Sequence, residues 1–196
     1  MQAIVRSPRT AEFADVWYAA REMARKPIPA KDDIPLRWLA PFMPQLILHR
    51  GTADGRTLCL LFGTGLADLF GRDLTGAYLD DSMRPENAAA RHATFQNYYA
   101  EHGRDAPFGR WVLGELRSSR GRNVQFESLA LPYIEPIDGS IRHMAHVLAL
   151  ATLDHGEGLI PHFLENTTRM FTPDGGRPDW LHTDPQSPYA DGRHSA

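Results

Sequence analysis

Apolar residues recur at helical spacing in some stretches of the chain and in short strand-like runs in others, which predicts the order of its elements. A stripe of apolar residues every three or four positions predicts helices over 10–26 and 84–101. Short apolar runs predict strands over 45–50 and 57–62, which an Asp-Gly turn joins as a hairpin. The remaining expected elements are short helices at 36–42 and 66–70 and strands at 108–118, 123–133 and 141–153.

This order predicts an α+β fold in which one five-stranded antiparallel sheet carries helices on one face. Several strands are apolar at both alternating positions, so both faces of the sheet should be covered. The available cover is the N-terminal helix, the C-terminal segment or a partner subunit. We therefore divide the chain into an N-terminal helical extension (1–27), a central sheet domain (28–155) and a C-terminal extension (156–196).

The C-terminal extension is expected to be irregular and partly disordered. Residues 162–170 are interpreted as one or two amphipathic turns. Residues 172–196 are dense in Pro, Gly, Asp and Ser and contain few apolar residues, a composition that rarely forms a packed core.

The N-terminal helix has an apolar face formed by Phe13, Trp17 and Ala20. A terminal helix of this kind either docks on its own domain or pairs with another copy, and the sequence leaves both alternatives open. We take the three residues as candidate interface residues, for a homodimer or for a signalling partner.

Composition narrows the classes of function. The formal net charge of -3 is small, which argues against binding to nucleic acid or to an acidic membrane surface. No segment approaches the ~18 consecutive apolar residues of a membrane span, and the N-terminus lacks a signal-peptide pattern. The single cysteine, Cys59, lies in an apolar run and is expected to be a buried thiol. We expect a cytoplasmic protein with no nucleic-acid or membrane partner.

The stretch from Leu58 to Tyr78 predicts a pocket wall, because a strand gives way to a short helix and tight turns. Aromatic and aliphatic residues of this stretch, of the long helix and of the third strand would form the pocket, with Thr64, Tyr78 or Arg72 for directional hydrogen bonds. The candidates are Phe62, Thr64, Leu66, Leu69, Phe70, Tyr78, Phe95, Tyr98 and Trp111. The alternative is that these side chains simply fill a closed core.

The sequence offers few candidates for a catalytic, metal-binding or nucleotide-binding site. Gly63-Thr64-Gly65 follows a strand, but Asp68 stands where a dinucleotide-binding loop needs its last glycine. His143 and His146 are three apart on a predicted strand, so they point to opposite faces and cannot easily share a metal ion. Glu115 and Glu127 are interpreted as solvated strand residues beside Arg117 or Arg110. We expect no catalytic residue, no metal site and no cofactor.

Spaced motifs give the chain a resemblance to a known family. They are the entry Ile28–Pro35, Phe62-Gly63-Thr64, Phe70–Gly76 (FGRDLTG), Leu131-Pro132-Tyr133 and Asp138-Gly139. In this order they resemble a compact single-domain bacterial PAS-type family, over about residues 28–153. An arginine that members often carry in the second strand has no counterpart in residues 58–62.

The resemblance implies a PAS-like fold for the central domain and a sensor or regulatory role in signalling. Such a module acts through protein–protein interaction, and it binds a small apolar or amphipathic ligand or none. The alternative is an enzyme on a similar α+β cone fold, of isomerase or dehydratase type, which would need an acid–base pair in its cavity.

Overall fold

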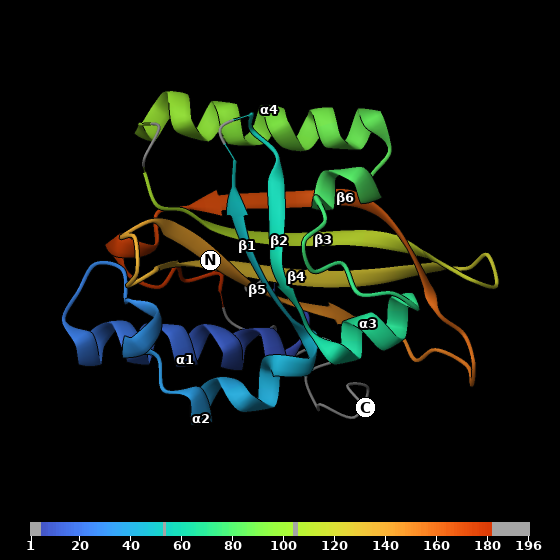
Figure 1. Ribbon diagram of the computed structural model, residues 1–196, viewed down its shortest axis with the longest axis horizontal. Helices are drawn as coiled ribbons and strands as arrows, with labels where there is room; N and C mark the ends of the chain where they lie inside the picture. Colours follow the sequence, from blue (N-terminus) through green and yellow to red (C-terminus); the bar gives the residue numbers. More distant parts are fainter. Residues whose placement is uncertain (1–4, 53, 104–105, 182–196) are drawn as a thin grey trace.

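The computed structural model describes residues 5–52, 54–103 and 106–181 and forms an α+β domain around one curled sheet (Figure 1). The helices are α1 (Pro8–Ala24), α2 (Leu36–Leu39), α3 (Thr64–Phe70) and α4 (Pro85–His102). The strands are β1 (Leu46–Gly51), β2 (Thr57–Phe62), β3 (Gly109–Ser118), β4 (Asn123–Ile134), β5 (Ile141–Ala149) and β6 (Leu159–Phe171). Short 3-10 helices are η1 (Lys31–Asp33), η2 (Ala40–Gln45), η3 (Leu79–Ser82) and η4 (Pro173–Gly175).

The sheet has the strand order β2-β1-β5-β4-β3-β6, and every neighbouring pair is antiparallel. The β1–β2 hairpin was predicted from its Asp-Gly turn, and β3 and β4 were predicted as consecutive strands. The crossover through α3, η3 and α4 takes the chain from edge strand β2 to β3. Strand β5 then returns to the middle, between β1 and β4.

Helices cover both faces of the sheet, as the two-sided apolar pattern of the strands predicted. In Figure 1, α4 lies along one side of the sheet and α1 with α2 along the other. One core cluster joins α1 to Leu129, Leu131 and Met144, and includes Trp180 and Leu181 from beyond β6. The second cluster joins α3 to the opposite face of the same strands. The N-terminal helix and the C-terminal segment therefore both serve as cover.

The sheet has six strands, so the expectation of five was wrong. Strand β6 lies in the segment expected to form only an amphipathic turn or two before an irregular tail. It pairs along β3 from Gly109↔Phe171 to Ser118↔Leu159, with two shifts of register on the way. Hydrogen bonds to a neighbouring strand stabilise this segment, although its own sequence lacks a clear alternation. Proline is tolerated in edge strands, which is where Pro161 lies.

Helix α1 docks on its own domain, which corrects the prediction of an interface on its apolar face. Phe13, Trp17 and Ala20 are fully buried within the single chain. The Trp17 indole Nε1 donates a hydrogen bond of 2.7 Å to the carbonyl oxygen of Pro132 in β4. Side chains with no exposed surface cannot contact a second molecule unless the helix leaves the sheet.

Glu127 is fully buried in β4, not a solvated strand residue as expected. Its carboxylate accepts hydrogen bonds from the backbone N–H groups of Arg6 and Ser7, from Thr10 Oγ1 and from Trp111 Nε1. Burial raises the pKa of Glu127 above its ordinary value, while the four donors oppose this and favour the carboxylate. The residue fixes the start of α1 on the sheet.

Replacing Glu127 by glutamine is expected to lower the free energy of unfolding by about 1–3 kcal/mol. The four groups around the carboxylate all donate hydrogen bonds, so an amide NH₂ would face donors in place of an acceptor. Urea denaturation checks this, with Glu115→Gln as the matched control because Glu115 is only half-buried in β3. Equal midpoints for the two variants would contradict the role given to Glu127.

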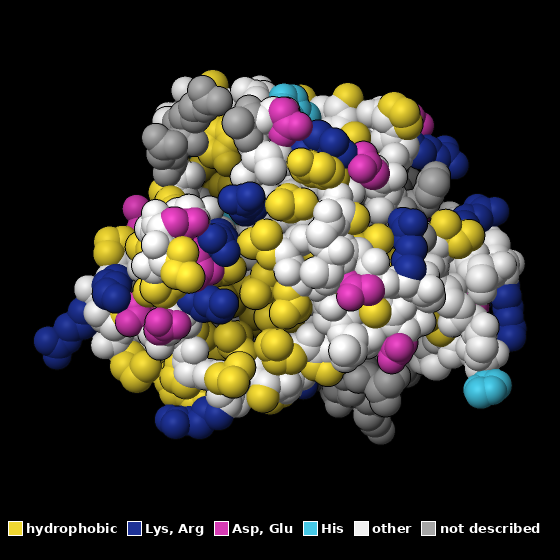
Figure 2. All heavy atoms as spheres, viewed as in Figure 1, with side chains coloured by type: hydrophobic (Ala, Val, Ile, Leu, Met, Phe, Trp, Pro, Cys, Tyr) yellow, Lys and Arg dark blue, Asp and Glu magenta, His cyan; other side chains and the backbone are white. Residues whose placement is uncertain are grey.

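Some large apolar side chains remain in solvent. Among the described residues, Leu36 is 70% exposed, Ile137 90% and Ile141 37%. Figure 2 shows apolar side chains in the hollow centre of one face of the molecule, with Lys and Arg side chains along its left side. Apolar surface of this kind often marks a contact with another molecule.

Candidate functional site

The structure does not bring the nine predicted pocket residues together. Phe62, Leu66 and Phe70 are buried with Cys59 in a filled core beside α3, where the rings of Phe62 and Phe70 are 5.8 Å apart. Trp111 belongs to the core on the other face of the sheet, beneath α1. For these residues the closed-core alternative is correct.

The other candidates lie apart from this core. Thr64 is exposed and Leu69 is half-buried. The half-buried Tyr78 ring packs 3.7 Å from the guanidinium of Arg56. Phe95 and Tyr98 belong to α4, and they lead to the site that the fold does assemble.

Aromatic and basic side chains converge between α4 and the sheet, on the same face as α3. We call them the α4 polar cluster: His49 from β1, Arg91 and Phe95 from α4, Phe108 before β3, Arg110 from β3 and His143 from β5. Both guanidinium groups lie over the Phe95 ring, Arg91 at 5.4 Å and Arg110 at 5.5 Å from its centroid. The four polar side chains are buried, with exposed fractions between 5% and 8%.

The two histidines lie next to each other because β1 and β5 pair in a register that sets His49 opposite His143. Their rings stack at a centroid distance of 5.4 Å and an interplanar angle of 12°. The Phe108 ring stacks on His143 at 4.0 Å. Three rings from three separate segments thus form one layer beneath α4.

Burial keeps both imidazoles neutral. It lowers the pKa of His143 to about 3, with Arg110 lowering it further and a backbone hydrogen bond to Phe108 opposing the shift. The pKa of His49 is lowered well below its ordinary value by burial, and then by His143, Arg91 and Arg110. His49 Nδ1 and His143 Nε2 are buried without a hydrogen-bond partner in the structure. A buried polar atom left unsatisfied costs about 1–3 kcal/mol.

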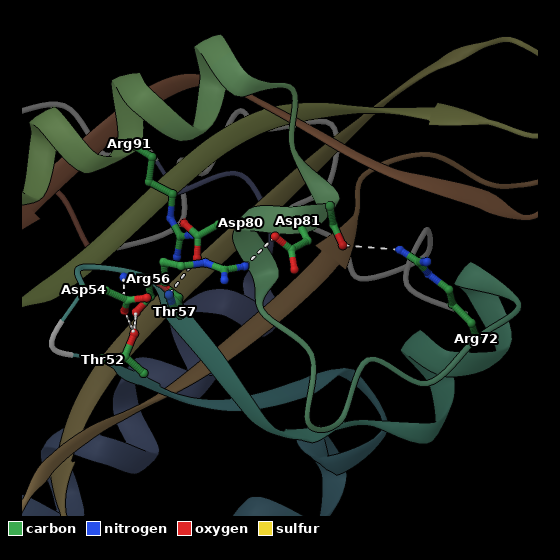
Figure 3. A network of polar contacts seen from close by, with 9 residues as sticks. Thr52, Asp54, Arg56, Thr57, Arg72, Asp80, Asp81 and Arg91 are labelled. Carbon is green, nitrogen blue, oxygen red and sulfur yellow. Dashed lines mark hydrogen bonds and ion pairs between the residues drawn. The ribbon is translucent and has the colours of Figure 1, made fainter.

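A network of polar contacts holds the first half of α4 at the edge of the sheet (Figure 3). Arg91 points from α4 to Asp80 in η3, and its Nη1 lies 3.3 Å from the carboxylate oxygen Oδ1. The other oxygen of Asp80 accepts a hydrogen bond of 2.6 Å from the backbone N–H of Thr57 in β2. In the same network Arg56 pairs with Asp81, and Arg72 donates to Ser82 Oγ. Asp80 therefore positions the guanidinium of Arg91 above the sheet.

An open cleft of about 810 Å³ adjoins this cluster, between α4 and the segment that follows β6. Its lining residues are Thr94, Asn97, Tyr98, Glu101, His102, Met170, Phe171, Thr172 and Gly175 to Trp180. The Tyr98 hydroxyl donates to the carbonyl oxygen of Pro107 at 2.8 Å, and its ring lies 5.9 Å from that of Phe108. Because Phe108 also stacks on His143, the Tyr98 ring links the wall of the cleft to the α4 polar cluster.

Sequence reasoning missed most of this cluster. Arg91 is one of many polar residues of α4, and Arg50 follows His49 in β1, so the sequence gives no clear signal that sets these residues apart. The prediction that His143 and His146 point to opposite faces is confirmed: His146 contacts Phe13 on the α1 side. Among the side chains described in residues 5–52, 54–103, 106–160 and 167–181, no three His, Cys, Asp or Glu residues form a group that could hold a metal ion.

Cys59 is a buried free cysteine, and burial raises the pKa of its thiol to about 12, which keeps it protonated and unreactive. Among the helices that the structure describes, none is long and apolar enough to span a membrane.

A family model described as "PAS domain" matches residues 5–147. The matched range begins before α1 and ends in β5, so it includes the helix that the sequence analysis assigned to a separate extension. A search of curated proteins finds no match.

Proposed function

Because the chain belongs to the PAS domain family, we propose that it is a non-enzymatic sensor or regulatory module that binds a small ligand at the α4 polar cluster and signals to a protein partner. The observation that carries the ligand half is the pair of buried imidazole nitrogens, His49 Nδ1 and His143 Nε2, that have no hydrogen-bond partner. A core selected for stability alone would have apolar side chains here. Polar groups that weaken a core in this way mark functional sites.

Helix α4 covers the site, and few of its side chains hold it against the sheet. Arg91 and Tyr98 are the fully buried residues of α4, which is 18 residues long. Little apolar surface therefore holds the helix against the sheet, and its stability depends on ring contacts and on the Asp80 network. Displacement of α4 by a ligand would alter its exposed face, which a partner protein can detect.

The partner half of the proposal rests on the apolar surface. The exposed side chains of Leu36, Ile137 and Ile141 and the apolar hollow in Figure 2 favour a contact with another protein. A homodimer remains one form of this contact, although not through the buried face of α1. The charged groups that act on the pKa of His49 and His143 are arginines, so an acid–base pair of the isomerase type gains no support.

Native mass spectrometry of the purified protein tests the ligand half. We expect a species heavier than the bare chain, which returns to the mass of the chain on denaturation. His143→Phe is expected to lose this extra mass, while His92→Gln, a change on the exposed side of α4, should keep it. Wild-type protein that shows only the mass of the bare chain would contradict the ligand half.

A further inference from the structure

We infer that the open cleft between α4 and the segment after β6 binds a small organic dication: a diamine, in which a short methylene chain separates two ammonium groups. The cleft is a second site, because it shares no residue with the α4 polar cluster. Three features carry the inference: the walls of the cleft, the sign of their charge and the apolar surface between the charged groups.

Two separate segments form the walls of the cleft. One wall is a single face of α4, because Thr94, Tyr98 and Glu101 are spaced by three or four residues. The other wall is the end of β6 and the residues from Gly175 to Trp180. The volume of about 810 Å³ lies in the range of small-molecule sites.

Each wall carries one carboxylate. Glu101 lies on the α4 wall and Asp179 on the other, and both side chains are exposed. In the described part of the chain, neither carboxylate has an ion-pair partner. Arg177 also lines the cleft, but its guanidinium group pairs with Asp15 and donates to the carbonyl oxygen of Ala11, both in α1. The carboxylates therefore leave the cleft with a negative charge that favours a cation.

The surroundings of Tyr98 have the same sign of charge. Burial first, and then the negative charges of Asp174 and Glu101, raises the pKa of Tyr98 to about 12. The His102 ring stacks on Tyr98 at 4.3 Å, and its Nδ1 donates to the Tyr98 carbonyl oxygen at 3.1 Å. In a neutral ring Nε2 is then an acceptor. The end of α4 thus offers acceptors, which an ammonium group with its three N–H donors can use.

Apolar surface lies between the two carboxylates. Met170 and Phe171, at the end of β6, are half-buried and line the cleft. The Trp180 ring already contacts the guanidinium group of Arg169, 5.6 Å from its centroid, so the other two side chains are the surface left for a ligand. A methylene chain fits this surface, and an ammonium group at each end of the chain gives each carboxylate a partner.

A diamine in the cleft would connect the covers of the two sheet faces. Its α4 wall belongs to the helix over one face, whereas Trp180 and Leu181 pack in the core beneath α1 on the other face. Binding would therefore hold α4 against the C-terminal segment.

Isothermal titration calorimetry with three probes tests the inference on the full chain at about pH 8, where primary amines carry a charge. The probes are 1,4-diaminobutane, butylamine, which lacks the second ammonium group, and 1,4-butanediol, which has none. We expect the diamine to bind about fivefold to tenfold more tightly than butylamine, as for one added charge-assisted contact at a partly exposed site. The diol should bind more weakly than either, and added salt should weaken diamine binding.

Variants assign the effect to the cleft. Glu101→Gln and Asp179→Asn should each reduce the affinity for the diamine to about that of butylamine for the wild type. Glu86→Gln is the matched control, because Glu86 is an exposed residue of α4 outside the cleft. It should bind the diamine like the wild type, and so should His143→Phe, which changes the α4 polar cluster.

Four results would overturn the inference: equal affinity for the diamine and butylamine, diol binding as tight as diamine binding, no binding of any probe, or unchanged binding in both carboxylate variants. None of these results bears on the proposed function. Its test is the extra mass that the wild-type protein retains and His143→Phe loses.

Discussion

Trp17→Ala is expected to lower the free energy of unfolding by about 3–5 kcal/mol, the usual cost of truncating a large aromatic side chain in a core. Trp17 is fully buried in α1, and its indole ring contacts Tyr18 edge-on at 4.9 Å. The change would also leave the carbonyl oxygen of Pro132 without its hydrogen bond from Nε1. Urea denaturation, followed by circular dichroism, measures the effect.

Met23→Ala is the control for this substitution, because Met23 lies on the same helix and is 58% exposed. Its effect should stay within about 0.5 kcal/mol. Light scattering on both variants distinguishes a core role from an interface role. A Trp17→Ala protein that keeps its stability but loses a partner subunit would restore the interface interpretation of α1.

As the pH is lowered, the protein is expected to lose stability at pH values well above those at which its surface carboxylates take up protons. His49, His143 and His146 are buried, and burial lowers the pKa of each, to about 3 for His143 and His146. The unfolded chain therefore binds protons below about pH 6.5 that the native state does not. The free energy of unfolding is therefore highest above that pH, and it falls as the pH decreases toward the pKa values of the histidines in the native state.

The expected loss is about 1 kcal/mol for each buried histidine between pH 6.5 and 5.5, or about 3 kcal/mol in total. The raised pKa of Glu127 acts in the opposite direction, so single-histidine variants give the cleaner measurement. His146→Leu should remove about a third of the pH dependence, measured by urea denaturation at the two values. His92→Gln, at an exposed position, should leave it unchanged. An identical pH dependence in wild type and His146→Leu would contradict neutral burial of the ring.

Both predictions concern how the two faces of the sheet contribute to stability. The contacts of α1, with Trp17 and Glu127 at their centre, stabilise the sheet from one face. The opposite face carries the unsatisfied nitrogens of His49 and His143. The stable face thus offsets the cost of burying the α4 polar cluster.

Several elements of the fold were predictable because their signals are local. The Asp-Gly turn marked the β1–β2 hairpin, and apolar residues at helical spacing marked α1 and α4. The spaced motifs identified the PAS family, which the family match confirms. Strand β6 was not predictable in the same way, because its stability comes from pairing with β3 at the edge of the sheet.

The candidate site was much less predictable than the fold. Phe95 was predicted to line a pocket and lies in the α4 polar cluster, but the pocket wall proposed for residues 58–78 is mostly filled core. His143 was considered only as a metal ligand with His146, and the β1–β5 register gives it His49 as its neighbour instead. A side chain's partner across a sheet depends on the register of the paired strands, and the sequence of either strand alone does not determine that register.

The sequence by itself determined the antiparallel α+β architecture and the need for cover on both sheet faces, since period and turn chemistry act over a few residues. Only the tertiary structure decided that α1 docks on its own domain, that a sixth strand completes the sheet and that two arginines and two histidines meet beneath α4. The physical reason is the same in each case. These features depend on contacts between segments that are distant in the sequence, such as Trp17 with Pro132 and His49 with His143.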